Sequence, residues 1–65
     1  MTTANIQLIT NKTNTLAAAM KIEDQLEGMS TSEKLADMAR RFSLIKKTEA
    51  AQDCLNMKAM YEKLS

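Results

Sequence analysis

The chain has 65 residues, with nine lysines and arginines against eight aspartates and glutamates, no histidine and a single cysteine. A chain of this length forms one domain at most and buries only about 60% of the surface that its unfolded form exposes. Small folds of this kind usually need disulfides, a metal or another chain for stability. One cysteine without histidine supplies neither a disulfide within the chain nor the usual zinc ligands, so association with another protein chain is expected.

The charge and the hydropathy pattern exclude two classes of protein. The formal net charge of +1 is far from the strongly basic balance of a dedicated nucleic-acid binder. The longest uninterrupted apolar run, Leu16 to Met20, has five residues, whereas a spanning helix needs about 20 and a signal-peptide core about 7 to 15. We therefore expect no membrane contact, and the unpaired cysteine favours the reducing cytoplasm.

The composition predicts an all-α fold. The sequence has no proline, no valine, one glycine and two aromatic residues, whereas strands and tight turns draw on these residue types. We expect residues 1–65 to form a single small helical domain.

The stretch before Gly28 predicts one amphipathic helix over about residues 14–27, with Asn14 as its N-cap. At about 100° per residue, its apolar side chains fall on one wide face. Residues 1–13 stay open in this prediction, because their asparagines and threonines compete with helical hydrogen bonds and favour frayed or extended chain.

The segment around Gly28 predicts a turn over residues 28–31. Gly28 can adopt the left-handed conformation that ends a helix, and Ser30 with Glu33 has the spacing of a capping box. Helices joined by such a short connection pack antiparallel, so a helical hairpin is expected. Its predicted core consists of Leu16, Met20, Leu26, Leu35, Met38, Phe42 and Ile45.

Apolar residues after the turn fall into two series that are out of frame with each other. The first is Leu35, Met38, Phe42 and Ile45, and the second is Ala50, Cys54, Met57, Tyr61 and Leu64. One long helix over about residues 32–63, straight or bent, could present both series to different neighbours. Alternatively, a break near Lys46 and Lys47 would give a third helix and a compact three-helix bundle. The absence of glycine and proline near this point favours the continuous helix.

The second series predicts a binding surface for another protein chain, because the hairpin uses the first. Flexible methionines line grooves that adapt to a partner, and Tyr61 would be the buried anchor. The predicted partner-binding residues are Ala50, Cys54, Met57, Met60, Tyr61 and Leu64.

Catalytic chemistry is not predicted. Acid-base catalysis usually recruits histidine, and the carboxylates here occupy the positions of solvated helix charges. Cys54 has no histidine that could lower the pKa of its thiol. We expect no catalytic residue, no metal site and no cofactor.

The sequence therefore favours a non-catalytic protein-interaction module that self-associates or binds a partner helix, as small assembly factors, co-chaperones and inhibitors do. The alternative is a small nucleic-acid-associated protein. On a continuous helix, Arg40, Lys47 and Lys58 would project within about 20° of one another and form a weak basic stripe.

Overall fold

The computed structural model describes residues 2–65, and the side chains of residues 3–65. Helix α1 spans Thr2–Met20, α2 spans Thr31–Leu44, α3 spans Thr48–Leu64, and a short 3-10 helix, η1, covers Glu23–Leu26. No strand occurs between residues 2 and 65. The predicted all-α class is confirmed, and Met1, which the domain prediction included, lies outside the described residues.

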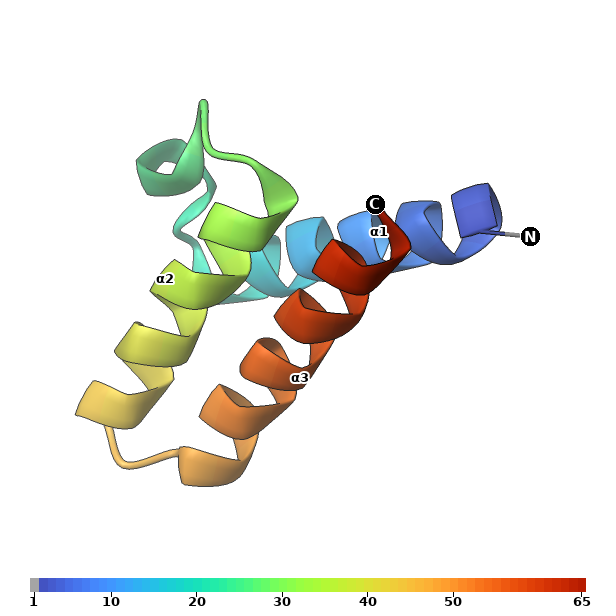
Figure 1. The fold of residues 1–65 in the computed structure, drawn as a ribbon. Coiled ribbons are helices and arrows are strands. Elements are labelled where there is room, and N and C mark those ends of the chain that lie inside the picture. The colour runs from blue at the N-terminus through green and yellow to red at the C-terminus, as the bar shows by residue number, and fades with distance from the viewer. Residues whose placement is uncertain (1) are drawn as a thin grey trace.

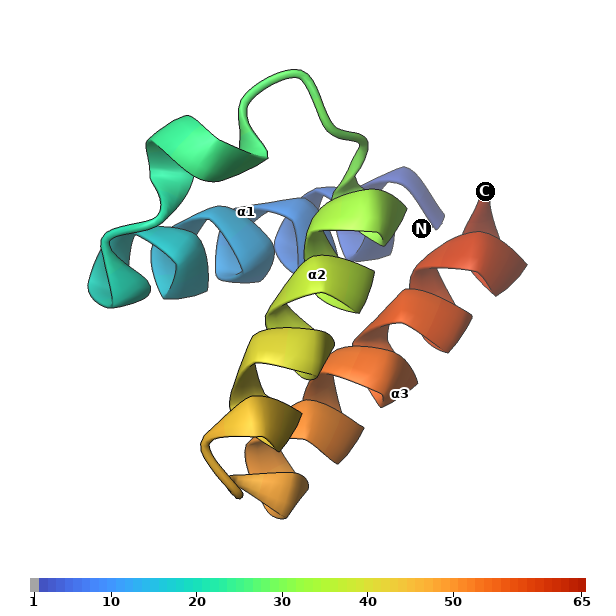
Figure 2. The ribbon, with the colours of Figure 1, turned by 90° about the vertical axis from the view of Figure 1, so that its left-hand side faces the viewer.

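Helices α2 and α3 run antiparallel, and α1 crosses this pair at a steep angle (Figure 1). Figure 2 shows the same arrangement from the side, with α1 behind the upper part of the pair and the α2–α3 turn at the bottom, away from α1. The predicted hairpin partners need correction, because α2 packs more extensively against α3 than against α1. Buried Ala39 and Ala51, one from each helix of the pair, are small enough to let the two backbones approach.

The core lies where the three helices and η1 meet. It consists of Ile9, Ala17, Ile22, Leu26, Leu35, Met38, Ala39, Phe42, Ala51 and Cys54. Four of the predicted core residues, Leu26, Leu35, Met38 and Phe42, are among these. Leu16 and Met20 are partly buried and pack against the cluster from its edge.

Helix α1 includes residues 2–13, which the sequence left open. Ile9 and Ala17 anchor one face of this helix in the core. Thr13 lies between them, fully buried, and its hydroxyl donates to the carbonyl oxygen of Ile9 at 2.7 Å. The Gln7 side chain likewise donates to Asn11 one turn later, at 3.0 Å. The polar groups that could compete with the helix are thus satisfied along it, and tertiary packing outweighs weak helix propensity.

The first helix ends at Met20, so the prediction of a helix over 14–27 is wrong at both ends. Lys21 adopts a left-handed conformation with φ 60°. The Lys21 N–H donates to the carbonyl of Ala18, and the Ile22 N–H donates to that of Ala17. These two bonds form a Schellman motif, and the buried Ile22 and Ala17 provide its usual apolar contact. η1 then turns Leu26 into the core.

The turn at Gly28 and the start of α2 have the predicted local structure. Gly28 has φ 85°, in the left-handed region. The Ser30 hydroxyl accepts from the Glu33 N–H at 3.1 Å, and the Glu33 carboxylate accepts from the Ser30 N–H at 2.9 Å. This reciprocal pair is the predicted capping box.

The second arm is not one continuous helix. Lys46 adopts a left-handed conformation with φ 63°. Lys46 and Lys47 donate to the carbonyls of Ser43 and Phe42, which is the same Schellman pattern that ends α1. The chain therefore has the three helices of the alternative prediction. Lysine, and not glycine, occupies the left-handed position at both helix ends, at a cost of about 1 to 2 kcal/mol each.

Ile45 does not belong to the core, contrary to the prediction. It is the C-cap of α2, and its side chain is 59% exposed. The 3-4-3 spacing that joined it to Phe42 loses its meaning once the helix ends at Leu44.

Within residues 2–65, no helix is both long and apolar enough to cross a lipid bilayer.

Candidate protein-interaction surface

An apolar groove lies between α1 and α3. It consists of two adjoining hollows of about 450 Å³ each, which share Lys12, Leu16 and Met57. One hollow reaches inward to Phe42 and Cys54, and the other extends along α1 to Thr15 and Ala19. Most of the exposed lining is apolar, and five polar side chains also contribute to it: Asn11, Lys12, Thr15, Asp53 and Asn56.

The groove is lined from two sides, by residues 11–19 of α1 and by residues 50–57 of α3. Leu16 and Met57 pack against the core from its edge and remain partly exposed on the groove side. No other segment between residues 2 and 65 covers this part of the surface. Concave apolar surfaces with a few polar groups at the rim are typical of binding sites.

The predicted partner-binding residues lie in three different environments. Ala50 and Met57 line the groove and are partly exposed. Tyr61 and Leu64 are partly buried and pack against the core, while Met60 is 57% exposed. The predicted partner-binding residues therefore do not form one exposed surface, because α1 occupies part of the space that the sequence assigned to a partner.

Cys54 is the clearest correction among the predicted partner contacts. Its side chain is 1% exposed, so it forms part of the groove floor and not a contact point. Burial is the main cause that raises the pKa of the thiol, and the negative charge of Asp53 raises it further. A buried thiol with a raised pKa is a weak nucleophile, and Cys54 acts here as a small apolar residue.

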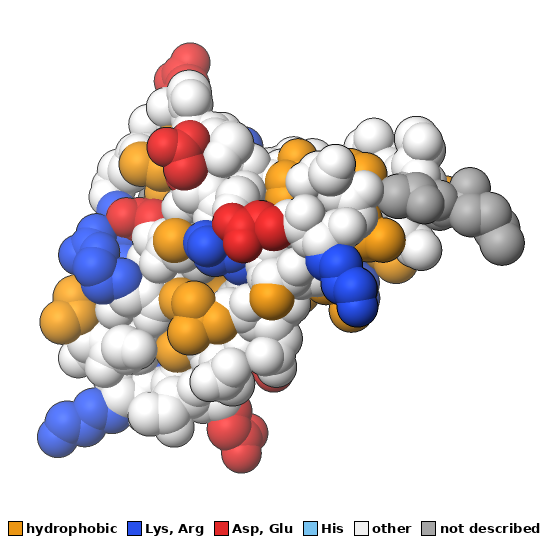
Figure 3. All heavy atoms as spheres, viewed as in Figure 1, with side chains coloured by type: hydrophobic (Ala, Val, Ile, Leu, Met, Phe, Trp, Pro, Cys, Tyr) orange, Lys and Arg blue, Asp and Glu red, His pale blue; other side chains and the backbone are white. Residues whose placement is uncertain are grey.

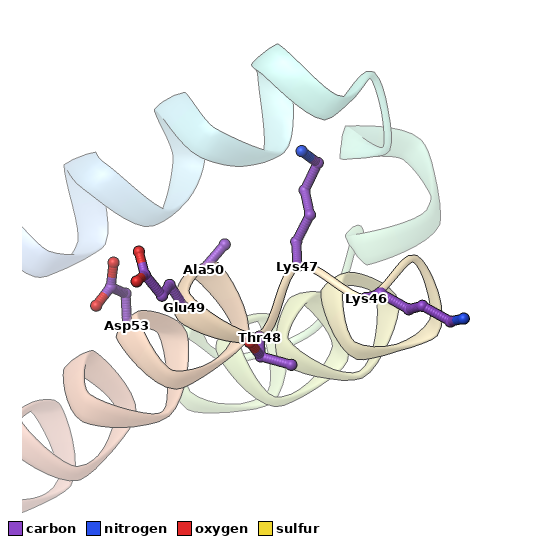
Figure 4. A pocket seen from close by; sticks show the side chains of 6 residues that line it. All are labelled: Lys46, Lys47, Thr48, Glu49, Ala50 and Asp53. Atoms are coloured by element: carbon purple, nitrogen blue, oxygen red, sulfur yellow. The ribbon is translucent and has the colours of Figure 1, made fainter.

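A third hollow, separate from the groove and of about 550 Å³, lies beside the α2–α3 turn (Figure 4). Lys47 extends toward α1, and Lys46 points away from it. Glu49 and Asp53 project in the same direction from the first turns of α3. Charges of both signs line this hollow, so it has no clear preference for an anion or a cation.

The basic stripe of the nucleic-acid alternative does not form as predicted. Arg40 and Lys47 belong to segments separated by the break at Lys46, so the common helix that would align them with Lys58 is absent. Arg40 pairs with Asp37 at 2.9 Å, and Lys58 pairs with Glu62 at 2.9 Å. Figure 3 shows basic and acidic side chains interspersed on one face of the molecule.

The carboxylates with specific partners stabilise a single helix or join two helices. Hydrogen bonds from Arg41, and next from Arg40, lower the pKa of Asp37. The Ser32 hydroxyl, followed by Lys58, lowers the pKa of Glu62 and ties the start of α2 to the end of α3. Among the described residues, no three cysteine or acidic side chains lie close enough together to hold a metal ion.

Sequence reasoning missed the α1 side of the groove, namely Lys12, Thr15 and Ala19. A signal for it was present, because Lys12 interrupts the apolar face of the first segment. A charged residue at such a position often marks the solvent edge of a helix face. This interpretation requires that residues 2–13 are helical, which local propensity did not indicate.

Likeness to known proteins offers no guide to the groove. A comparison of the chain with protein families, with curated proteins and with solved structures found no match.

Proposed function

We propose that this chain is a non-catalytic protein-interaction module whose α1–α3 groove receives apolar side chains of another chain. One observation carries the proposal: Leu16 and Met57 line a hollowed apolar surface and remain partly exposed there. Lys12 and Asp53 lie at the same surface and supply polar contacts. An apolar centre with a polar rim is the usual anatomy of a protein interface.

The small size of the domain supports this function. A 65-residue chain has little core with which to offset its conformational entropy. A second chain in the groove would bury additional apolar surface and stabilise the folded state by mass action. The shape of the groove suits an occupant helix, because the hollows follow two neighbouring helices.

The chemistry of the reactive side chains also supports a binding role. The thiol of Cys54 is buried, and the chain has no histidine that could act as its base. Asp37 is engaged by Arg41 within α2, and Glu62 is engaged by Lys58 within α3 and by Ser32 of α2. None of these groups combines exposure, a perturbed pKa toward neutrality and a neighbouring base, the features typical of catalysis.

The test is a pair of glutamate substitutions on α3. Met57→Glu places a charge in the groove, whereas Ala59→Glu places the same charge on an exposed position roughly opposite on the helix. We expect Met57→Glu to lose self-association and the capture of partners from an extract of the native host. Ala59→Glu should keep both, and circular dichroism should show similar helix content for the two variants. Equal binding by both variants would contradict the proposed function of the groove.

A further inference from the structure

Two rows of side chains with the same spacing run through the groove and extend beyond it. The row on α1 consists of Leu8, Lys12, Thr15 and Ala19, and the row on α3 consists of Asp53, Met57, Met60 and Leu64. Of these, Lys12, Thr15, Ala19, Asp53 and Met57 line the groove itself. Each row has 4-3-4 spacing and falls within an arc of about 60° at 3.6 residues per turn. This spacing is typical of helices that pack side by side along a seam.

Both rows include large apolar side chains that reach solvent. Leu8 is 52% exposed, and Met60 is 57% exposed. Each lies one helical turn along its row from a residue that lines the groove, Leu8 before Lys12 and Met60 after Met57. Exposed apolar groups that adjoin a hollow in this way mark an interaction site more reliably than scattered ones.

Each row carries one charge, and the two charges have opposite signs. Lys12 is the only charged residue of the α1 row, and Asp53 is the only one of the α3 row. The ion pairs among residues 3–65 join Asp37 to Arg40 and Arg41, and Lys58 to Glu62. Lys12 and Asp53 line the same hollow from opposite helices but form no ion pair with each other, so each can meet an opposite charge on an occupant.

From these rows we infer that the occupant of the groove is a second copy of this chain, placed by a two-fold axis. In a two-fold contact, each residue pair occurs twice. The α1 row of one copy then meets the α3 row of the other, so that both Lys12 side chains face an Asp53 of the opposite copy. A surface with one cation on one side and one anion on the other is complementary to itself under this symmetry.

This inference rests on the proposed function and specifies the occupant. A helix from an unrelated protein would need a matching pair of charges of its own, whereas a second copy supplies them from the same sequence. The formal net charge of +1 also means that two copies repel each other only weakly.

The test reverses the two charges in separate variants. In Lys12→Glu, every symmetric contact would bring two carboxylates together, and in Asp53→Lys it would bring two lysines together. Each variant alone should therefore dimerise about tenfold or more weakly than the wild type, since like charges across an interface are unfavourable. In a heterodimer of the two variants, both contacts join opposite charges. One contact joins the introduced glutamate to the introduced lysine, and the other joins the original Lys12 to the original Asp53. We therefore expect the mixture to form a one-to-one heterodimer.

Sedimentation equilibrium of each variant and of the mixture measures this directly, and circular dichroism checks that both exposed substitutions leave the helices intact. A mixture that associates no better than its components would overturn the inference. If the wild type stays monomeric at every concentration, the second copy is also excluded. The proposed function then stands or falls separately, on whether Met57→Glu abolishes capture of another protein.

Discussion

The helical pair α2–α3 and the crossing helix α1 reach the same secondary structure by different routes. Helix α2 begins with a capping box and buries Leu35 and Met38 completely. Helix α1 is rich in asparagine and threonine, has no acidic residue in its first turn and no basic residue in its last. Local signals therefore specify α2, whereas α1 depends on contacts with the rest of the molecule. Because α1 forms one wall of the groove, the candidate site depends on those contacts as well.

The largest expected difference concerns isolated segments. A peptide of residues 2–20 should have little helix in water, because short helices without tertiary contacts are marginal and asparagine and threonine weaken this one further. A peptide of residues 30–65 should keep much of its helix content, since α2 and α3 pack on each other. Far-ultraviolet circular dichroism measures both. A strongly helical 2–20 peptide would contradict the claim that α1 depends on contacts with the rest of the molecule.

Within α2, two leucines separate burial from helix propensity. Leu35 is fully buried, and Leu44 is 71% exposed. Leu35→Ala should lower the free energy of unfolding by about 3 kcal/mol, since it removes core contacts and leaves a cavity. Leu44→Ala should change it by less than about 0.5 kcal/mol. Urea denaturation of both variants gives the values, and similar losses would show that the core is misplaced.

The left-handed lysine at the α2–α3 turn predicts a stabilising substitution. Lys46 has φ 63°, a conformation that glycine adopts without steric cost. Lys46→Gly should raise the free energy of unfolding by about 0.5 to 1 kcal/mol, since it relieves about 1 to 2 kcal/mol of steric cost, part of which is offset by greater chain entropy in the unfolded state. Lys46→Ala is the matched control, because it removes the same charge and keeps the β-carbon. If both variants change stability equally, the turn does not have this conformation.

The smallest expected effect concerns pH. Hydrogen bonds from Arg41 and Arg40 lower the pKa of Asp37, and those from Ser32 and Lys58 lower the pKa of Glu62. A carboxyl group whose pKa is lower in the folded state stabilises that state above its unfolded pKa. This stability is lost as the pH falls through the folded pKa, so acid should destabilise the protein. Urea titrations should show a smaller loss on acidification in Asp37→Asn and Glu62→Gln than in the wild type.

The sequence predicted those parts of the fold that local chemistry specifies. The capping box of Ser30 and Glu33, and the left-handed Gly28, were visible as spacings. The ends of α1 and α2 were not, because Lys21 and Lys46 occupy positions where glycine is the usual signal. Helix formation over residues 2–13 was also hidden, since it depends on the packing of Ile9 and Thr13 against the other helices.

The candidate site was predicted on one side only. Met57 and Ala50 follow from the displaced apolar series on α3, and both line the groove. The α1 wall requires knowledge of the crossing angle between helices, which no local pattern supplies. Cys54 was included among the partner-binding residues for the same reason, because the position of α1 beside it could not be derived from spacing alone.

The most direct test of the account is a map of where a second chain binds. Amide chemical shifts of the wild type, recorded by NMR over a wide concentration range, report which residues enter a contact. We predict that the shifts that change belong to the two rows, around Lys12 and Thr15 on α1 and around Met57 and Met60 on α3. Shifts that change instead around the exposed Leu44 and Ile45, or no change at any concentration, would contradict the account.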